Sequence, residues 1–268
     1  MELNKLYNLS DYKDINSMLF NGDCLEVMKD IPDKSIDMIL CDLPYGTTAC
    51  KWDSIIPFDK LWEQYNRIIK DNGAIVLFAN EPFASLLRTS NLDMYRYDWI
   101  WNKGKPSNFQ LMNFQCGRVQ ELLLVFSKAK ACYTKTGNSI LYNPQMSDRE
   151  KPRKANAKIY GKNSLLHHYN TKDNLKVYDK KYPISILNFN PVIQNKLHPT
   201  QKPVDLLEYL IRTYTDEGLI VLDNCMGSGT TGVACINTNR KFIGMELDEN
   251  YFEIAQNRIN KVIKEKTI

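Results

Sequence analysis

Short apolar runs bounded by turn residues recur along the chain and alternate with stretches that have the apolar spacing of helices. Strands are predicted over residues 35–41, 74–79, 95–101, 119–127, 218–223 and 240–246. Helices are predicted over residues 24–30, 58–70, 83–89, 204–214 and 248–264, with a further helix ending near residue 237. Strands that alternate with helices are typical of an α/β protein with a mostly parallel sheet. Residues 1–19 are polar, and we interpret them as an arm.

The first predicted strand runs directly into Asp42-Leu43-Pro44-Tyr45. In open α/β sheets, ligands bind at the carboxyl ends of the strands. Pro44 fixes its own φ and disfavours helix at Leu43, so this loop is stiff. A carboxylate beside a carbonyl can accept both hydrogens of one exocyclic amine, and a tyrosine ring can stack on a flat heterocycle. We therefore interpret the stretch as an amine-activating clamp, although an ordinary Asp-Pro turn after a strand fits the same four residues.

A second stretch, Asp223 to Thr231, follows another predicted strand and leads into a helix. Its Gly227 and Gly229 allow a tight turn with close backbone approach, and the helix N-terminus behind them offers N–H groups to a ligand. The next strand ends in Glu246, and an acid at that place typically bonds ribose hydroxyls. Strand, glycine loop, helix, strand and acid in this order indicate a cofactor that contains a nucleoside.

Together, the two stretches resemble the DNA amino-methyltransferases that use S-adenosylmethionine. Residues 42–45 are similar to that family's (Asp/Asn/Ser)-Pro-Pro-Tyr motif, and residues 223–231 are similar to its Asp-Pro-Phe-x-Gly-Ser-Gly-Thr-Thr motif. The resemblance covers residues 20–127 and 196–262. The catalytic motif comes first, which is the permuted order of the family's beta group. Methylases of protein glutamine place the cofactor motif first, which argues against a protein substrate.

The resemblance implies a Rossmann-like methyltransferase fold with a mostly parallel seven-stranded sheet, flanking helices and a circularly permuted motif order. It divides the chain into a catalytic half (1–127), an inserted target-recognition region (128–195) and a cofactor-binding half (196–268). Such insertions are poorly shared within the family, so the DNA sequence that this one reads is not predicted.

The resemblance also implies roles for single residues. Asp42 and the Leu43 carbonyl would hold N6 of an adenine flipped out of the duplex, with Tyr45 stacked on the base and Pro44 between them. Leu43 replaces the family's first proline but keeps the carbonyl. The cofactor site would comprise Asp23, Cys24, His198, Thr200, Lys202, Asp223, Asn224, Gly227, Ser228, Gly229, Thr230, Thr231 and Glu246.

Within this implied cofactor site, Asp23 is a candidate acceptor for the adenine amino group, and Glu246 a candidate for the ribose. A helix N-cap explains Asp23 equally well. Thr200 and Lys202 are candidates for the methionine carboxylate, since a lysine is a suitable point charge. A helix start capped by proline also explains that segment. We reject His198 as a general base, because the proton of the activated amine can pass to Asp42 or to water. No metal is implied.

Composition sets further bounds. No apolar run in the 268 residues approaches the roughly 18–20 residues needed to span a bilayer. The first residues lack a signal-peptide pattern, and the seven cysteines form no C-x-x-C pair, so neither a disulfide framework nor a zinc site is indicated. We expect a cytoplasmic protein.

The charge distribution points to a partner. The net charge is only +4, yet residues 128–182 hold thirteen Lys or Arg and four Asp or Glu, with six tyrosines among them. A polyanion fits this pattern, because phosphates take the basic side chains and aromatic groups touch bases. A solvated, lysine-rich insertion is the alternative.

Our sequence-based prediction is a site-specific DNA methyltransferase that acts on N6 of adenine in double-stranded DNA, with S-adenosylmethionine as cofactor. Asp at the first position of the catalytic motif favours adenine, whereas Ser is commoner in enzymes that act on cytosine N4. The alternatives are a cytosine-N4 methylase, an RNA methylase and a DNA-binding protein with a dead pocket. The resemblance also suggests a homodimer, and a cognate restriction endonuclease as a partner.

Overall fold

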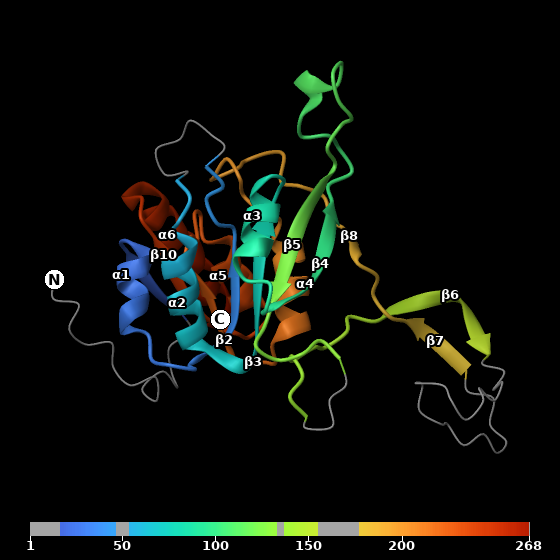
Figure 1. Cartoon of the computed structure of the whole chain (residues 1–268), viewed down its shortest axis with the longest axis horizontal. Helices are drawn as coiled ribbons and strands as arrows, with labels where there is room; N and C mark the ends of the chain where they lie inside the picture. Colours follow the sequence, from blue (N-terminus) through green and yellow to red (C-terminus); the bar gives the residue numbers. More distant parts are fainter. Residues whose placement is uncertain (1–16, 47–53, 133–136, 155–176, 268) are drawn as a thin grey trace. The chain divides into compact units, whose positions relative to one another are not determined.

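The computed structural model describes residues 17–46, 54–132, 137–154 and 177–267 (Figure 1). The chain divides into a main unit, residues 1–143 with 185–268, and a smaller unit, Pro144–Ile184. In the described part of the smaller unit, β6 (Ser147–Lys154) pairs antiparallel with β7 (Val177–Lys181). This small unit lies inside the predicted target-recognition region.

Within the described residues, the main unit is built on one eight-stranded sheet. The order is β1 (Ser17–Asn21), β10 (Lys241–Glu246), β9 (Ile220–Asp223), β2 (Ile36–Cys41), β3 (Ile69–Ala79), β5 (Gln120–Phe126), β4 (Tyr95–Asn102) and β8 (Ile186–Asn188). Only the pairs that include β5 are antiparallel. The predicted α/β class with a mostly parallel sheet is confirmed. The predicted count of seven strands is wrong, because β8 adds an edge strand beside β4.

Helices cover both faces of the sheet. They are α1 (Cys24–Val27), α2 (Phe58–Ile68), α3 (Phe83–Ser90), α4 (Val204–Tyr214), α5 (Thr230–Asn237) and α6 (Glu249–Thr267), with short 3-10 turns η2 (Met28–Asp30) and η3 (Phe109–Leu111). Successive side chains of a strand point to opposite faces, so β2 serves two cores. Met38 and Leu40 pack in the cluster with α4 to α6, whereas Ile39 and Cys41 pack in the cluster with α1 to α3. The strands therefore read as continuous apolar runs.

Some predicted boundaries are wrong. The helix expected over 58–70 ends at Ile68, because Ile69 already pairs with Ile36 as the first residue of β3. Residues 17–19, expected to belong to a polar arm, lie in β1, which pairs in parallel with β10. The helix expected over 24–30 is a four-residue α-helix followed by a 3-10 turn. Residues 1–16 of the expected arm lie outside the described residues.

One strand pairing brings the two motifs together. β2 and β9 are parallel neighbours, with Met38 opposite Val221 and Ile39 opposite Leu222. Both strands therefore end at the same edge of the sheet, and the loops that begin at Asp42 and Asn224 leave it side by side. Among the described residues, no helix is long and apolar enough to cross a membrane.

Candidate active site

A cavity of about 1070 Å³ opens at this edge of the sheet. Every residue predicted for the catalytic and cofactor sites lines the cavity except Gly229. Gly229 instead lies at the start of α5 with φ +75°, and a Cβ there would stand 2.9 Å from the Cβ of Ala255. Its place in the motif is therefore explained by backbone conformation and by close packing against α6.

The glycine loop after β9 is held by two carboxylates, one buried and one half-buried. Asp223 accepts hydrogen bonds from the Thr231 hydroxyl at 2.6 Å and from the Cys225 N–H at 3.1 Å. Burial raises the pKa of Asp223 to about 6. Glu246, at the end of β10, accepts from the N–H of Gly227 at 2.8 Å and from the N–H of Asp248 at 2.9 Å. These bonds shape the loop, and Glu246 still faces the cavity.

Arg258 of α6 braces the other side of the same loop. Its guanidinium donates to the Thr230 hydroxyl at 2.9 Å and to the Ser228 carbonyl at 3.1 Å. Both Ser228 and Thr230 are buried. Their side of the motif is thus fixed by α6 before any ligand arrives.

Asn224 and Cys24 meet at the base of the cavity. The side-chain Oδ1 of Asn224 accepts a 2.5 Å hydrogen bond from the Tyr65 hydroxyl, and its Nδ2 lies 3.5 Å from the Cys24 sulfur. Asp23 caps α1, accepting a 2.7 Å bond from the N–H of Leu25. The N-cap role of Asp23 is confirmed, and its side chain also lines the cavity.

His198 lines the cavity beside Gly227 of the glycine loop. Its ring stands edge-on to Tyr251, with the centroids 4.3 Å apart, and its Nδ1 lies 3.0 Å from the Thr200 hydroxyl. A Cβ on Gly227, whose φ is +50°, would come within 3.4 Å of the His198 ring. Burial, with help from Lys202, lowers the pKa of His198 to about 4, so the ring is neutral at pH 7.

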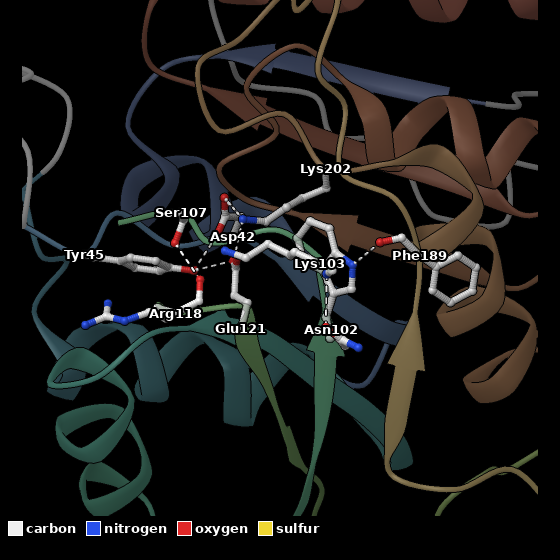
Figure 2. Close-up of polar contacts among 11 residues, drawn as sticks. Asp42, Tyr45, Asn102, Lys103, Ser107, Arg118, Glu121, Phe189 and Lys202 are labelled. Carbon is white, nitrogen blue, oxygen red and sulfur yellow. Dashed lines mark hydrogen bonds and ion pairs between the residues drawn. The ribbon is translucent and has the colours of Figure 1, made fainter. Parts of the chain in front are cut away.

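The loop after β2, residues 42–45, presents the Asp42 carboxylate to another side of the cavity. Tyr45 donates a 2.7 Å hydrogen bond to Oδ1 of Asp42, with a longer contact of 3.3 Å to Oε1 of Glu121 (Figure 2). The Tyr45 ring stacks on Phe83, with centroids 4.9 Å apart and planes at 28°. Leu43 is buried, which anchors the loop in the core. The Asp42 carboxylate and the Tyr45 ring are therefore both fixed.

Lys202 lines the cavity, and its ammonium is paired with this carboxylate. Its ammonium lies 2.9 Å from Oδ2 of Asp42 and 2.7 Å from Oε1 of Glu121 (Figure 2). Lys103 reaches the other oxygen of Glu121 at 3.3 Å. The four charges balance one another within a buried space.

Burial and these partners set the protonation states. Burial raises the pKa of Asp42, with Lys202 opposing the shift. Burial alone would also raise the pKa of Glu121, but Lys202 and Lys103 together hold it below its usual value. Burial would lower the pKa of Lys202, yet Asp42 and Glu121 raise it above its ordinary value. Lys202 and Glu121 are therefore charged at neutral pH.

Comparison with known proteins identifies the family to which the chain belongs. The N6/N4 family model, described as DNA methylase, matches residues 36–257, which is most of the chain. The chain belongs to the N6/N4 DNA methylase family. The protein is thus a DNA methyltransferase, and the predicted family is confirmed.

Curated relatives agree with the assignment of this methylase. It is 28% identical to type II methyltransferase M.HinfI of Haemophilus influenzae, over 95% of this chain and 70% of the relative. It is 27% identical to the DNA adenine methyltransferase YhdJ of Escherichia coli (strain K12), over 90% of this chain and 82% of the relative.

Solved structures show the same fold. A structure of M1.HpyAVI in complex with SAM has a TM-score of 0.58 and 23% identity, covering 90% of the methylase and 99% of that chain. The cytosine-N4-specific PvuII DNA methyltransferase has a TM-score of 0.64 and 17% identity, covering 93% of the methylase and 92% of that chain.

Sequence reasoning gave no role to Glu121 or Lys103 of the methylase. The signal for Glu121 was present, because an acid at the start of an otherwise apolar strand must be paired when that strand is buried. Lys103 lies just after β4 and pairs with Glu121. Its partner could not be found from the sequence, since Glu121 lies on the next strand.

Proposed function

We propose that the methylase transfers a methyl group from S-adenosylmethionine to N6 of an adenine in duplex DNA. The observation that carries the proposal is the Asp42 carboxylate, fixed at the end of β2 in the cavity that also holds the glycine loop. Similarity to a relative named as a DNA adenine methyltransferase supports the choice of base.

The residues present fit the cofactor. A cavity of about 1070 Å³ exceeds the roughly 300–1,000 Å³ of ordinary ligand pockets, which leaves room for a nucleoside cofactor and a base together. Glu246 would hold the ribose hydroxyls and Asp23 the adenine amino group, while Gly227 lets the backbone come close. When bound, S-adenosylmethionine supplies an electrophilic methyl group on a sulfonium. We assign it to the side of the cavity formed by the loops after β9 and β10.

Asp42 would orient the amine of the target base. Each carboxylate oxygen can accept about two hydrogen bonds. Oδ1 of Asp42 accepts one from Tyr45, and Oδ2 accepts one from Lys202. Acceptor positions therefore remain for the amine, and the Leu43 carbonyl offers another. Holding both amine hydrogens turns the nitrogen lone pair out of the ring and towards the methyl group. After transfer, Asp42 can take the excess proton, which its raised pKa favours.

Tyr45 would hold the base itself. A base inside a duplex must be extruded before an enzyme can act on it, at a cost of about a few kcal/mol. Phe83 covers one face of the Tyr45 ring and fixes its angle. The base would stack on the other face, so catalysis here rests on positioning and electrostatics.

The hairpin between β4 and β5 is our candidate for a DNA contact in the main unit. Residues 103–119 contain three basic side chains and no acidic one. The hairpin extends beyond the sheet and carries η3 at its tip (Figure 1). Phe109 and Phe114 on this tip are 70% and 88% exposed. Lys105 and Ser107, nearer the sheet, line the cavity. The hairpin therefore joins the cavity to an apolar tip suited to contact unstacked bases.

The smaller unit is our candidate for reading the DNA sequence. β7 is fully exposed, and the described residues of β6 and β7 carry basic and acidic side chains with Tyr178 among them. The basic excess of residues 128–182 suits contacts with phosphates. A homodimer and a partner endonuclease stay predictions.

The test of the function is to incubate the protein with tritium-labelled S-adenosylmethionine and mixed bacterial DNA, and then to separate the nucleosides. Label in the N6-methyl derivative of deoxyadenosine is expected. The second candidate is a cytosine-N4 methylase, which the fold similarity to the PvuII enzyme supports. Label in N4-methylcytosine would favour this candidate instead. Label in RNA alone would contradict the choice of substrate.

A further inference from the structure

We propose that Lys202 is a positioning residue that holds the Asp42 carboxylate in place, and that Glu121 anchors this lysine from the opposite side. This inference rests on the proposed function, in which Asp42 orients the target amine. It replaces the role predicted from the sequence, which gave Lys202 to the carboxylate of the cofactor.

The surroundings of Lys202 leave its ammonium little capacity for another anion. An ammonium has three N–H donors. Oδ2 of Asp42 and Oε1 of Glu121 lie 2.9 Å and 2.7 Å away, and the Phe78 ring centroid lies 4.8 Å away on a further side. Only 11% of the lysine side chain is exposed. A cofactor carboxylate would therefore have to share the ammonium with two carboxylates that already take two of its three donors.

Three separate parts of the fold meet at this ammonium. Asp42 follows β2, Glu121 lies in β5, and Lys202 lies just before α4 (Figure 2). Oδ1 of Asp42 is held by Tyr45 and Oδ2 by Lys202, so the carboxylate plane cannot turn. Such fixing matters for an acceptor that must meet two amine hydrogens at once.

Glu121 is paired with the neighbours of Asp42. Its side chain is only 6% exposed, and its two oxygens face Lys202 and Lys103. The Tyr45 hydroxyl adds a contact of 3.3 Å. Glu121 therefore acts on Asp42 by holding the lysine and the tyrosine that touch it.

The same contacts control the charge of Asp42. The groups facing this network are Lys202 before α4, Glu121 in β5, Lys103 after β4 and Tyr45 in the catalytic loop. Asp223, at the end of β9, is a further acid nearby. With Lys202 removed, Asp42 and Glu121 would face each other without the shared cation. Protonation of Asp42 would then persist to higher pH, and a protonated carboxyl is a poorer acceptor.

The test compares Lys202→Met and Glu121→Gln with the wild type in two measurements. Calorimetry gives the Kd for S-adenosylmethionine, and single-turnover methylation at saturating cofactor gives the rate against pH. For Lys202→Met we expect a rate about 100-fold lower at pH 7, in the range seen for the loss of one aimed donor. Its Kd should stay within about threefold of wild type, and the acid limb of its pH profile should move by more than about one unit to higher pH.

Glu121→Gln keeps the size of the side chain. It therefore tests the same network even if the Lys202→Met variant does not fold. We expect a smaller loss of rate, about tenfold, and an unchanged Kd, with the acid limb moved to lower pH, because the charge of Glu121 raises the pKa of Asp42. Lys103→Met is the graded control, because Lys103 touches Glu121 but is not paired with Asp42. Its effect should be the smallest of the three.

A Kd raised more than about 30-fold in Lys202→Met, with a rate near wild type at saturating cofactor, would overturn the proposal. That result would return Lys202 to the cofactor carboxylate. Failure of the wild type to methylate any DNA would instead count against the proposed function. The Kd comparison would still decide between the two roles of the lysine in that case.

Discussion

At the scale of residues, both ends of the cavity depend on carboxylates with different tasks. Glu246 faces the cavity and holds the Gly227 N–H, whereas Asp42 is paired with a lysine and a tyrosine. Sequence motifs identified both acids because each ends a strand. They could not reveal the pairing of Lys202 with Asp42, since the two lie far apart in the chain and only the folded sheet brings them together.

The first prediction at this scale concerns Glu246. Glu246→Gln keeps the shape but removes the charge that receives the Gly227 N–H and would receive the ribose hydroxyls. We expect the Kd for S-adenosylmethionine to rise about tenfold, the effect of one charge-assisted hydrogen bond of ~1.5 kcal/mol. Isothermal titration calorimetry measures it. Glu249→Gln, on an exposed residue outside the cavity, is the matched control and should change nothing.

A second prediction concerns acid sensitivity. The pKa of His198 is about 4 in the folded protein, below the usual value of about 6.5 in an unfolded chain. The unfolded chain therefore binds a proton more readily between these pH values, and the folded state loses stability as pH falls from about 6.5 to about 4. His198→Gln should remove this part of the loss, on the order of 1 kcal/mol after allowance for solvent screening. Urea unfolding at pH 7 and pH 5 measures it, and equal losses in both proteins would refute the assignment.

At the scale of elements, the parallel pair β2 and β9 is the feature that makes a site. Both strands were predictable as apolar runs ending in an acid, and so were the helices α2 and α4, because their apolar spacing is regular. β1 and β8 were not predicted. Each is short and lies at a sheet edge, where pairing with a neighbour rather than its own pattern makes it a strand.

The prediction at this scale concerns the turn into α5. Gly229→Ala must adopt φ +75° and place a Cβ 2.9 Å from that of Ala255, so we expect a loss of about 2–3 kcal/mol in the free energy of unfolding. Gly218→Ala separates the two causes, since Gly218 has φ +80° but nothing within 4 Å of a new Cβ. It should cost only about 1 kcal/mol. Equal losses in the two variants, by urea unfolding, would mean that packing against α6 contributes nothing.

At the scale of the whole molecule, the main unit holds every described residue of the site, and the smaller unit is inserted into it. The main unit ties down both flanks of the insertion. Asn143 N–H donates to the Thr213 carbonyl at 2.7 Å, and Ile100 N–H donates to the Ser185 carbonyl at 2.7 Å. The proposed chemistry and the proposed reading of DNA sequence therefore fall to different units.

Replacing residues 144–184 by a short Gly-Ser linker tests this separation. We expect a folded protein with an unchanged Kd for S-adenosylmethionine and a loss of methylation at specific sites of at least about 100-fold. Loss of cofactor binding would show that the smaller unit supports the main one.

A point variant tests the hairpin that leads from the cavity. Phe114→Ala should weaken binding of duplex DNA by about tenfold, in line with ~1–3 kcal/mol for one aromatic–base contact. Leu92→Ala is the matched control, because Leu92 is also exposed, at 61%, but lies at the opposite end of β4. Fluorescence anisotropy with a labelled duplex measures both. Equal affinities of the two variants for duplex DNA would show that the hairpin does not contact DNA.

The most direct test of the central claim is made on Asp42→Ala, with the Kd for S-adenosylmethionine and the single-turnover methylation rate measured on the same preparation. We expect the rate to fall by at least about 1,000-fold while the Kd stays within about threefold, because Asp42 orients the amine and does not hold the cofactor. A retained rate would show that another group activates the amine. A lost affinity would place Asp42 in the cofactor site and contradict the division of the cavity proposed here.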